Sequence, residues 1–162
     1  MADALIPGMT TEQTRAWRAL MGMTTWLPAA LDIQLQRDAG ISNAEYGALS
    51  TLALAETRSM RLTELARMAN SALSRISKMV SRFEEQGWVR READPDDRRA
   101  TRAVLTRDGY RKVAAATPDH VEFVQRLVFA ALTPEQIRGL AEAAESITAA
   151  AGPDGACSSR MS

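Results

Sequence analysis

The 162-residue chain contains only one cysteine and one histidine, which limits its chemistry. Cys157 has no second cysteine to pair with, so an internal disulfide is excluded and a reducing, cytoplasmic location is favoured. His120 has no second histidine with which to hold a metal ion, and we expect it to be packed or interfacial. The sequence therefore predicts neither a metal site nor another cofactor.

Long apolar runs and catalytic motifs are also missing. No run of about 18 apolar residues is present, so we expect no membrane-spanning helix. The first residues, MADALIPGMTTEQ, lack the basic and apolar regions of a signal peptide. The sequence has no glycine-rich phosphate loop, no Cys/His cluster and no nucleophile elbow, which argues against an enzyme.

What is present is an ordinary globular composition with an uneven distribution of charge. With 46% hydrophobic and 25% charged residues, we expect one folded domain over 11–150, a flexible segment at 1–10 and a disordered Gly/Ser tail at 151–162. The net charge is zero, but residues 58–112 hold fourteen basic and eight acidic residues, a local charge of +6 that the rest of the chain balances. Such a basic middle is typical of a surface that meets a polyanion.

Apolar residues at helical spacing predict a long helix over 11–38. Thr10 or Thr11 begins it, Gly40 ends it, and Pro28 should kink or divide it. The face that we expect to be buried carries Trp17, Leu20, Thr24, Leu27, Leu31 and Leu35.

Two further helices are predicted over 107–150. Pro118 should interrupt or bend the first, and a capping box at 133–136 begins the second. Their apolar faces carry Val121, Val124, Val128 and Ala131 in the first and Ile137, Leu140, Ala144 and Ile147 in the second.

Between these regions, residues 42–87 predict three shorter helices. A capping box at 42–45 starts the first, Thr63 caps the second, and Asn70-Ser71 ends the second and caps the third, which Gly87 terminates. The residues that we expect to face inward are Tyr46, Leu49 and Ala53, then Leu65, Ala66 and Ala69, then Leu73, Ile76, Val80 and Phe83.

The outward face of the third of these helices suits DNA. It combines short hydroxyls with long cations, which can bond to phosphates and to base edges in the major groove. The candidate recognition residues are Ser71, Ser74, Arg75, Ser77, Lys78, Ser81 and Arg82. Thr63, at the start of the preceding helix, is a candidate phosphate contact. A solvated charged face is the plainer interpretation of the same pattern.

Two short strands, at 88–92 and 102–106, enclose the charged stretch READPDDRRATRAVLT, which runs from Arg91 to Thr106. A charged hairpin directly after a helix-turn-helix predicts a winged helix. Its arginines could enter a minor groove while Asp94, Asp96 and Asp97 hold them in place. A hydrophilic turn with no partner is the alternative.

DPDDRRATRAVLTRDG, preceded by LARMANSALSRISKMVSRFEEQGWV, resembles the MarR family of bacterial transcription regulators, and the helix pattern extends the resemblance from about Thr10 to Ala150. The resemblance implies a mainly α fold with a small β-hairpin wing, a winged helix-turn-helix at about 42–106 and dimerisation helices at about 11–38 and 107–150. It also implies a homodimeric repressor on a palindromic double-stranded operator. By position, Asp97 is the wing acid and Arg99 the minor-groove arginine, with Arg98 and Arg102 as additional basic residues.

Many members of that family release DNA when a small aromatic or phenolic anion binds between the dimerisation region and the DNA-binding lobe. The residues that could line such a pocket are Trp26, Leu27, Leu31, Tyr46 and Met60, although core packing is the stronger explanation for each of them. Two other functions stay open: a helical protein-interaction module and a non-specific DNA-binding protein. Salt dependence and sequence preference of duplex binding would separate them.

Overall fold

The computed structural model describes residues 6–97 and 99–152, so Arg98 and Cys157 lie outside the described residues. The chain divides into two compact units, Met1–Val121 and Glu122–Ser162. The first unit holds a winged helix and the long helix that precedes it. The predicted fold class, mainly α with a small β-hairpin wing, is confirmed.

Helix α1 spans Thr11–Ala39 and begins with a capping box in which Thr10 and Gln13 bond reciprocally. Gly40 ends it at φ 65°, the left-handed conformation that favours glycine. Pro28 lies inside α1 without dividing it, because this proline is exposed and the one carbonyl that it leaves unpaired can bond to water. Of the face predicted to be buried, Leu35 is buried, whereas Trp17 is 43% exposed within this single chain.

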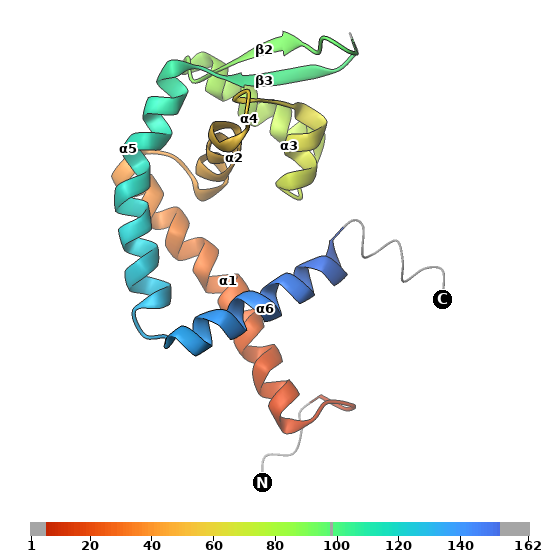
Figure 1. Ribbon diagram of the computed structural model, residues 1–162, viewed down its shortest axis with the longest axis vertical. Coiled ribbons are helices and arrows are strands. Elements are labelled where there is room, and N and C mark those ends of the chain that lie inside the picture. The colour runs from red at the N-terminus through yellow and green to blue at the C-terminus, as the bar shows by residue number, and fades with distance from the viewer. Residues whose placement is uncertain (1–5, 98, 153–162) are drawn as a thin grey trace. The chain divides into compact units, whose positions relative to one another are not determined.

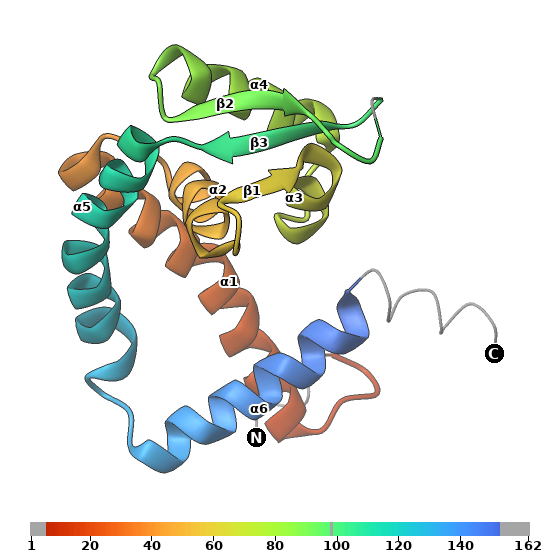
Figure 2. The ribbon, with the colours of Figure 1, turned by 45° about the horizontal axis from the view of Figure 1, so that its top comes forward.

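The winged helix follows as α2 (Asn43–Leu54), β1 (Ser59–Arg61), α3 (Leu62–Met68), α4 (Leu73–Glu85), β2 (Val89–Ala93) and β3 (Thr101–Leu105). The strands form an antiparallel sheet in the order β1-β3-β2, with Ala103 opposite both Met60 and Arg91. Figure 2 shows the three strands side by side and the β2–β3 hairpin extending beyond the helices. β1 was not predicted, because a three-residue strand has too short a pattern and forms only by pairing with β3.

One hydrophobic core joins α2, α3, α4 and the sheet. Figure 1 labels these helices and the strands β2 and β3. α4 contributes Ile76, Met79, Val80 and Phe83 to this core. The predicted inward stripe was therefore wrong at Leu73, which is 47% exposed, because α4 begins there and its first turn projects past the core. Ala69, also predicted to be buried, is exposed at the end of α3.

Two predicted helix caps differ in the structure. α3 begins at Leu62, so Thr63 lies inside its first turn and does not cap it. Asn70 does end α3, with φ 43°, but Ser71 precedes the next helix and Ala72 occupies the N-cap position of α4 without a side-chain hydrogen bond. Gly87 terminates α4 as predicted: at φ 72° it lets its own N–H reach the Glu84 carbonyl and the Trp88 N–H reach the Phe83 carbonyl.

Helix α5 (Arg107–Val124) runs through Pro118, so this proline does not interrupt it as predicted. The α-helix ends at Val124 and continues as the π-helix η1 (Gln125–Phe129). In the second unit, α6 (Pro134–Ala151) starts with the predicted capping box at 133–136. None of the α6 residues is buried, and Ile147 is 50% exposed. None of the described helices is long and apolar enough to cross a membrane.

Gly109 joins α5 to the sheet by close backbone packing. A Cβ at this position would lie 2.1 Å from the Trp88 carbonyl oxygen, and that oxygen is fixed because it accepts the Thr106 N–H. We therefore expect Gly109→Ala to lower the free energy of unfolding by about 1–3 kcal/mol or more, measured by urea denaturation. Gly139→Ala is the matched control, since α6 has open space there and alanine should raise the stability of the helix slightly. Equal effects of the two substitutions would contradict this interpretation.

Candidate nucleic-acid interface

Asp94 is a buried carboxylate at the start of the turn between β2 and β3, and five donors converge on it. Arg61 of β1 binds it through two parallel bonds of 2.7 Å each, and Arg102 of β3 adds a third at 3.1 Å. The backbone N–H groups of Asp96 and Asp97 donate at 3.0 and 3.1 Å. Both oxygens of the carboxylate therefore accept hydrogen bonds from groups of this chain, and this one side chain connects the turn to β1 and β3.

Arg102 is held on a second side as well. Its guanidinium donates to the Ser59 hydroxyl at 2.9 Å and to the Ser59 carbonyl at 3.2 Å. The sequence placed Arg102 among the wing arginines that contact DNA, but the structure places its guanidinium against β1, between Asp94 and Ser59. The prediction that the loop's own carboxylates hold its arginines is confirmed for Asp94 and Arg102.

The wing turn itself is closed by Asp97. Its side chain accepts the Arg99 N–H at 3.0 Å, and its carbonyl accepts the Ala100 N–H at 2.9 Å. The Arg99 side chain is exposed, and no carboxylate of the described residues forms an ion pair with it. Arg99 is thus the basic residue at the described tip of the wing, whereas Asp94 and Asp97 shape the backbone that carries it.

The polar residues predicted on the outward face of α4 fall into two groups: some have no side-chain partner, and others bond to neighbouring elements. Ser74, Arg75 and Lys78 are exposed, and none of the three forms a hydrogen bond or ion pair among the described side chains. Arg82 is also exposed, but it pairs with Glu45 of α2 at 2.9 Å. Ser71 lies outside the helix, in the turn before it. The free donors are therefore concentrated on the first two turns of α4.

Ser77 and Ser81 face β2 instead, because Arg91 lies along that side of α4. The Arg91 guanidinium donates to the Ser77 carbonyl at 2.8 Å and to the Ser77 and Ser81 hydroxyls at 3.1 Å, and it forms an ion pair with Glu84. The sequence pattern did not reveal this role of Arg91. The sequence signal that could have indicated it is Glu84, the first acidic residue of α4, which lies seven positions before Arg91 and has the opposite charge.

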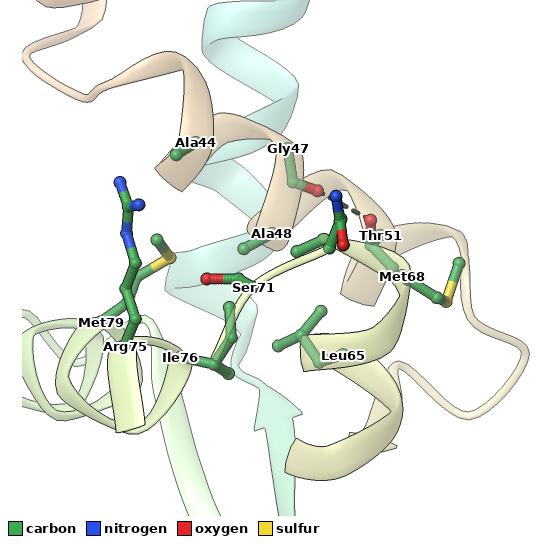
Figure 3. Close-up of a pocket in the computed structure, with 12 residues that line it drawn as sticks. Ala44, Gly47, Ala48, Thr51, Leu65, Met68, Ser71, Arg75, Ile76 and Met79 are labelled. Carbon is green, nitrogen blue, oxygen red and sulfur yellow. Dashed lines mark hydrogen bonds between the residues drawn. The ribbon is translucent and has the colours of Figure 1, made fainter. Parts of the chain in front are cut away.

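A cavity of about 330 Å³ lies between α2, α3 and α4, within the winged helix (Figure 3). Its wall is mainly apolar, with Leu65, Met68, Ile76 and Met79 among the lining residues, and Arg75 stands at one side. The Thr51 hydroxyl donates to the Gly47 carbonyl at 2.8 Å and is thereby satisfied within α2. None of the five residues predicted to form an effector pocket lines this cavity.

Those five residues have different surroundings. Trp26 is 75% exposed on α1, and Leu27 and Leu31 are partly buried on the same helix. Met60 belongs to the hydrophobic core on β1, so its side chain packs against other core residues and is not free to line an open pocket. Tyr46 packs against the core and against His120.

His120 lies in a polar network between α1, α2 and α5. Its Nδ1 is 2.8 Å from the Gln34 Oε1, and its ring centroid is 4.6 Å from that of Tyr46. The Gln34 Nε2 donates to Asp38, so the Gln34 Oε1 is free to accept, and the His120 Nδ1 carries the proton. The Tyr46 hydroxyl bonds to Thr117 at 3.1 Å. The sequence expectation of a packed histidine is confirmed.

Comparison with known proteins agrees with this architecture. The family model described as MarR family matches residues 41–101. The crystal structure of Sco3205, a MarR family transcriptional regulator from Streptomyces coelicolor, in complex with DNA is 42% identical, with a TM-score of 0.84 over 90% of this chain and 94% of that one. AbsC, another MarR family regulator from Streptomyces coelicolor, is 31% identical, with a TM-score of 0.81 over 88% of this chain and 96% of that one.

A curated relative gives a shorter match. The transcriptional regulator HosA of Escherichia coli O111:H- is 38% identical over 79 residues, which are 46% of this chain and 58% of HosA. The match to Sco3205, by contrast, spans nearly the whole of both chains. The fold is that of a winged-helix transcriptional regulator, and the chain belongs to the MarR family.

Removing the charge at Asp94 should destabilise the winged helix at neutral pH. The Arg61 guanidinium, with Arg102 and the turn N–H groups, holds the pKa of the Asp94 carboxyl well below its usual range, although burial opposes them. Because the pKa is lower in the folded state, the stabilisation is present above pH 4 or so and is lost as the pH falls further. We expect Asp94→Asn to lower the melting temperature at pH 7 and to differ less from the wild type at pH 3. Asp96→Asn, which keeps its backbone N–H, is the control and should melt as the wild type does.

The His120 network should make stability depend on pH in a second window. Burial lowers the pKa of His120. The unfolded chain therefore takes up the proton first, and stability is lost as the pH falls below about 6.5. His120→Asn can still donate to Gln34 but does not titrate, so its free energy of unfolding should change little between pH 7.5 and 5.5 while that of the wild type decreases. As this is the chain's single histidine, an equal decrease in both proteins would show that another group is responsible.

Proposed function

We propose that the chain is a sequence-specific DNA-binding repressor that acts as a homodimer on a palindromic double-stranded operator. The observation that carries the proposal is the pairing of two features in one lobe: the free donors on the first two turns of α4 and the fixed wing that presents Arg99. A helix-turn-helix places the start of its second helix in the major groove, where Ser74, Arg75 and Lys78 would meet base edges and phosphates.

The wing supports the same mode of binding. Asp94 and Asp97 fix the backbone of the turn, so Arg99 loses less freedom on entering a minor groove than an arginine on an unrestrained loop. Arg102, already held by Asp94 and Ser59, would act by holding the wing in place, with Thr63 of the first α3 turn as a phosphate contact. That Sco3205, 42% identical, was crystallised with DNA favours this assignment over a protein-interaction module.

Dimerisation is supported by apolar side chains that this single chain leaves exposed. Trp17, Met21 and Trp26 are exposed on α1, and Ile147 is exposed on α6. Apolar surface of this kind on a folded chain is typical of a contact with another protein. A homodimer in which α1, α5 and α6 cover one another would bury it, and a two-fold dimer matches a palindromic DNA site.

Release by a small aromatic or phenolic anion is the regulatory part of the proposal. It rests on family resemblance and on the apolar residues Trp26, Leu27 and Leu31 of α1, which are exposed or partly exposed, together with Tyr46 of α2. Phenolic acids titrated into the protein–DNA complex should lower the anisotropy of labelled DNA. If none of a representative panel does so at millimolar concentration, this part of the proposal is wrong.

The first test is fluorescence anisotropy with the purified protein, its own upstream DNA and a scrambled duplex, at several salt concentrations. Selection of preferred sites from random duplexes would supply an operator if the upstream DNA contains none. A preferred duplex that saturates at one dimer per site and binds about 10³-fold or more tightly than random DNA would support the proposal. Equal, salt-sensitive affinity for every duplex would indicate a non-specific binder, and no binding at low salt would favour the protein-interaction module.

Arg75 provides the sharpest test of base reading. We expect Arg75→Ala to weaken binding to the preferred operator by about 1–3 kcal/mol and to relax selectivity at one base pair in each half-site, because one bidentate contact is lost. Arg138→Ala removes the same charge from α6, where Arg138 pairs with Glu135, and should leave selectivity unchanged. Uniform weakening on every sequence would make Arg75 a phosphate contact.

A further inference from the structure

Leu73 is a large apolar side chain at a position where it gains little from folding. The residues of α4 that belong to the core are Ile76, Met79, Val80 and Phe83, and Leu73 is not among them. It is the first residue of the helix and is 47% exposed. Helical periodicity predicted that Leu73 is buried. Since it is not, packing in the core does not explain why this position holds a leucine.

The neighbours of Leu73 are the residues proposed to meet DNA. Ser74 and Arg75 follow it directly on the exposed first turn, and Lys78 follows one turn later. Ala72, at the N-cap, is exposed and contributes no side-chain hydrogen bond, and the first turn contains no acid. The start of α4 therefore combines polar donors with an apolar surface that is open to any partner the helix approaches.

We propose that Leu73 determines part of the sequence specificity by contacting the C5-methyl group of a thymine in each half-site. The inference rests on the proposed function, because it requires α4 to enter the major groove. Among the four bases, only thymine displays a hydrocarbon group there, and apolar side chains recognise it by contact. Arg75 offers hydrogen bonds suited to guanine, so the two side chains would recognise different bases: Arg75 a guanine and Leu73 a thymine.

The geometry of a helix limits where this thymine lies. Leu73 and Arg75 are two residues apart on the first turn of α4, which separates them by about 3 Å along the helix axis and about 200° around it. The thymine should therefore lie in the same half-site as the base that Arg75 reads, within a few base pairs of it. Burying one methyl group is worth about as much as one CH₂, which corresponds to roughly fourfold in affinity per half-site.

The experiment uses the full chain and its selected operator, in which each thymine is replaced in turn, in both half-sites, by deoxyuridine. This change removes only the methyl group. We expect one replacement to weaken wild-type binding by roughly tenfold or more over the two half-sites, and to have no effect on binding by Leu73→Ala. Leu73→Met keeps an apolar contact and should remain sensitive to the same replacement. Leu54→Ala, which removes a more exposed leucine from α2, should respond as the wild type does.

Three other outcomes would overturn the inference, and they differ in what they say of the proposed function. If Leu73→Ala loses affinity on deoxyuridine replacement as much as the wild type does, Leu73 does not contact the methyl group, although the operator stands. If no thymine methyl affects binding, the inference also fails alone. A wild-type protein without preference for any duplex would overturn both proposals. Melting temperatures of the variants, which should stay near that of the wild type for this exposed position, exclude misfolding as the cause.

Discussion

The buried carboxylate of Asp94 is the interaction on which the winged part of the structure depends. A buried ion pair is costly to form unless the charges are closely matched and their remaining hydrogen bonds are satisfied. Here Arg61 supplies two parallel bonds, and Arg102 and two backbone N–H groups supply the others. Because the donors come from β1, β3 and the turn, the same contact sets the sheet register, the turn conformation and the position of the wing relative to α3.

A second contact fixes the other half of the lobe. Arg91 joins β2 to α4 through Ser77, Ser81 and Glu84, so α4 and the wing hairpin are held to the same sheet. This arrangement separates two classes of polar residue that look alike in the sequence. Serines and arginines between α4 and β2 hold the lobe together, whereas Ser74, Arg75 and Lys78 are exposed and form no ion pair among the described residues. A rigid lobe with few free donors is what geometric reading of base edges requires.

Much of the fold could be predicted because its signals are local. Capping boxes at Thr10, Ser42 and Thr133 and the glycine at position 87 set helix ends to within a residue or two. Some local signals failed, such as the predicted caps at Thr63 and Ser71, but the larger failures depended on contacts distant in sequence. Leu73 follows the apolar period but lies past the edge of the core, and β1 exists only through its pairing with β3. At the candidate site, the sequence predicted the helix α4 and the β2–β3 hairpin but could not separate the paired arginines from the free ones.

That separation changes how the charge of the chain should be understood. The segment from 58 to 112 carries +6, yet within the described residues six of its fourteen basic side chains already form ion pairs with acids of the same chain. The strong salt dependence of a DNA complex comes from the cations that reach phosphates and displace counterions, not from those neutralised internally. If α4 and the wing meet DNA as proposed, Arg75, Lys78 and Arg99, which form no ion pair among the described residues, are a better measure of the charge available to phosphates than the total is. Because these few unpaired cations lie on α4 and the wing, a chain with no net charge can still offer a localised positive surface to a polyanion.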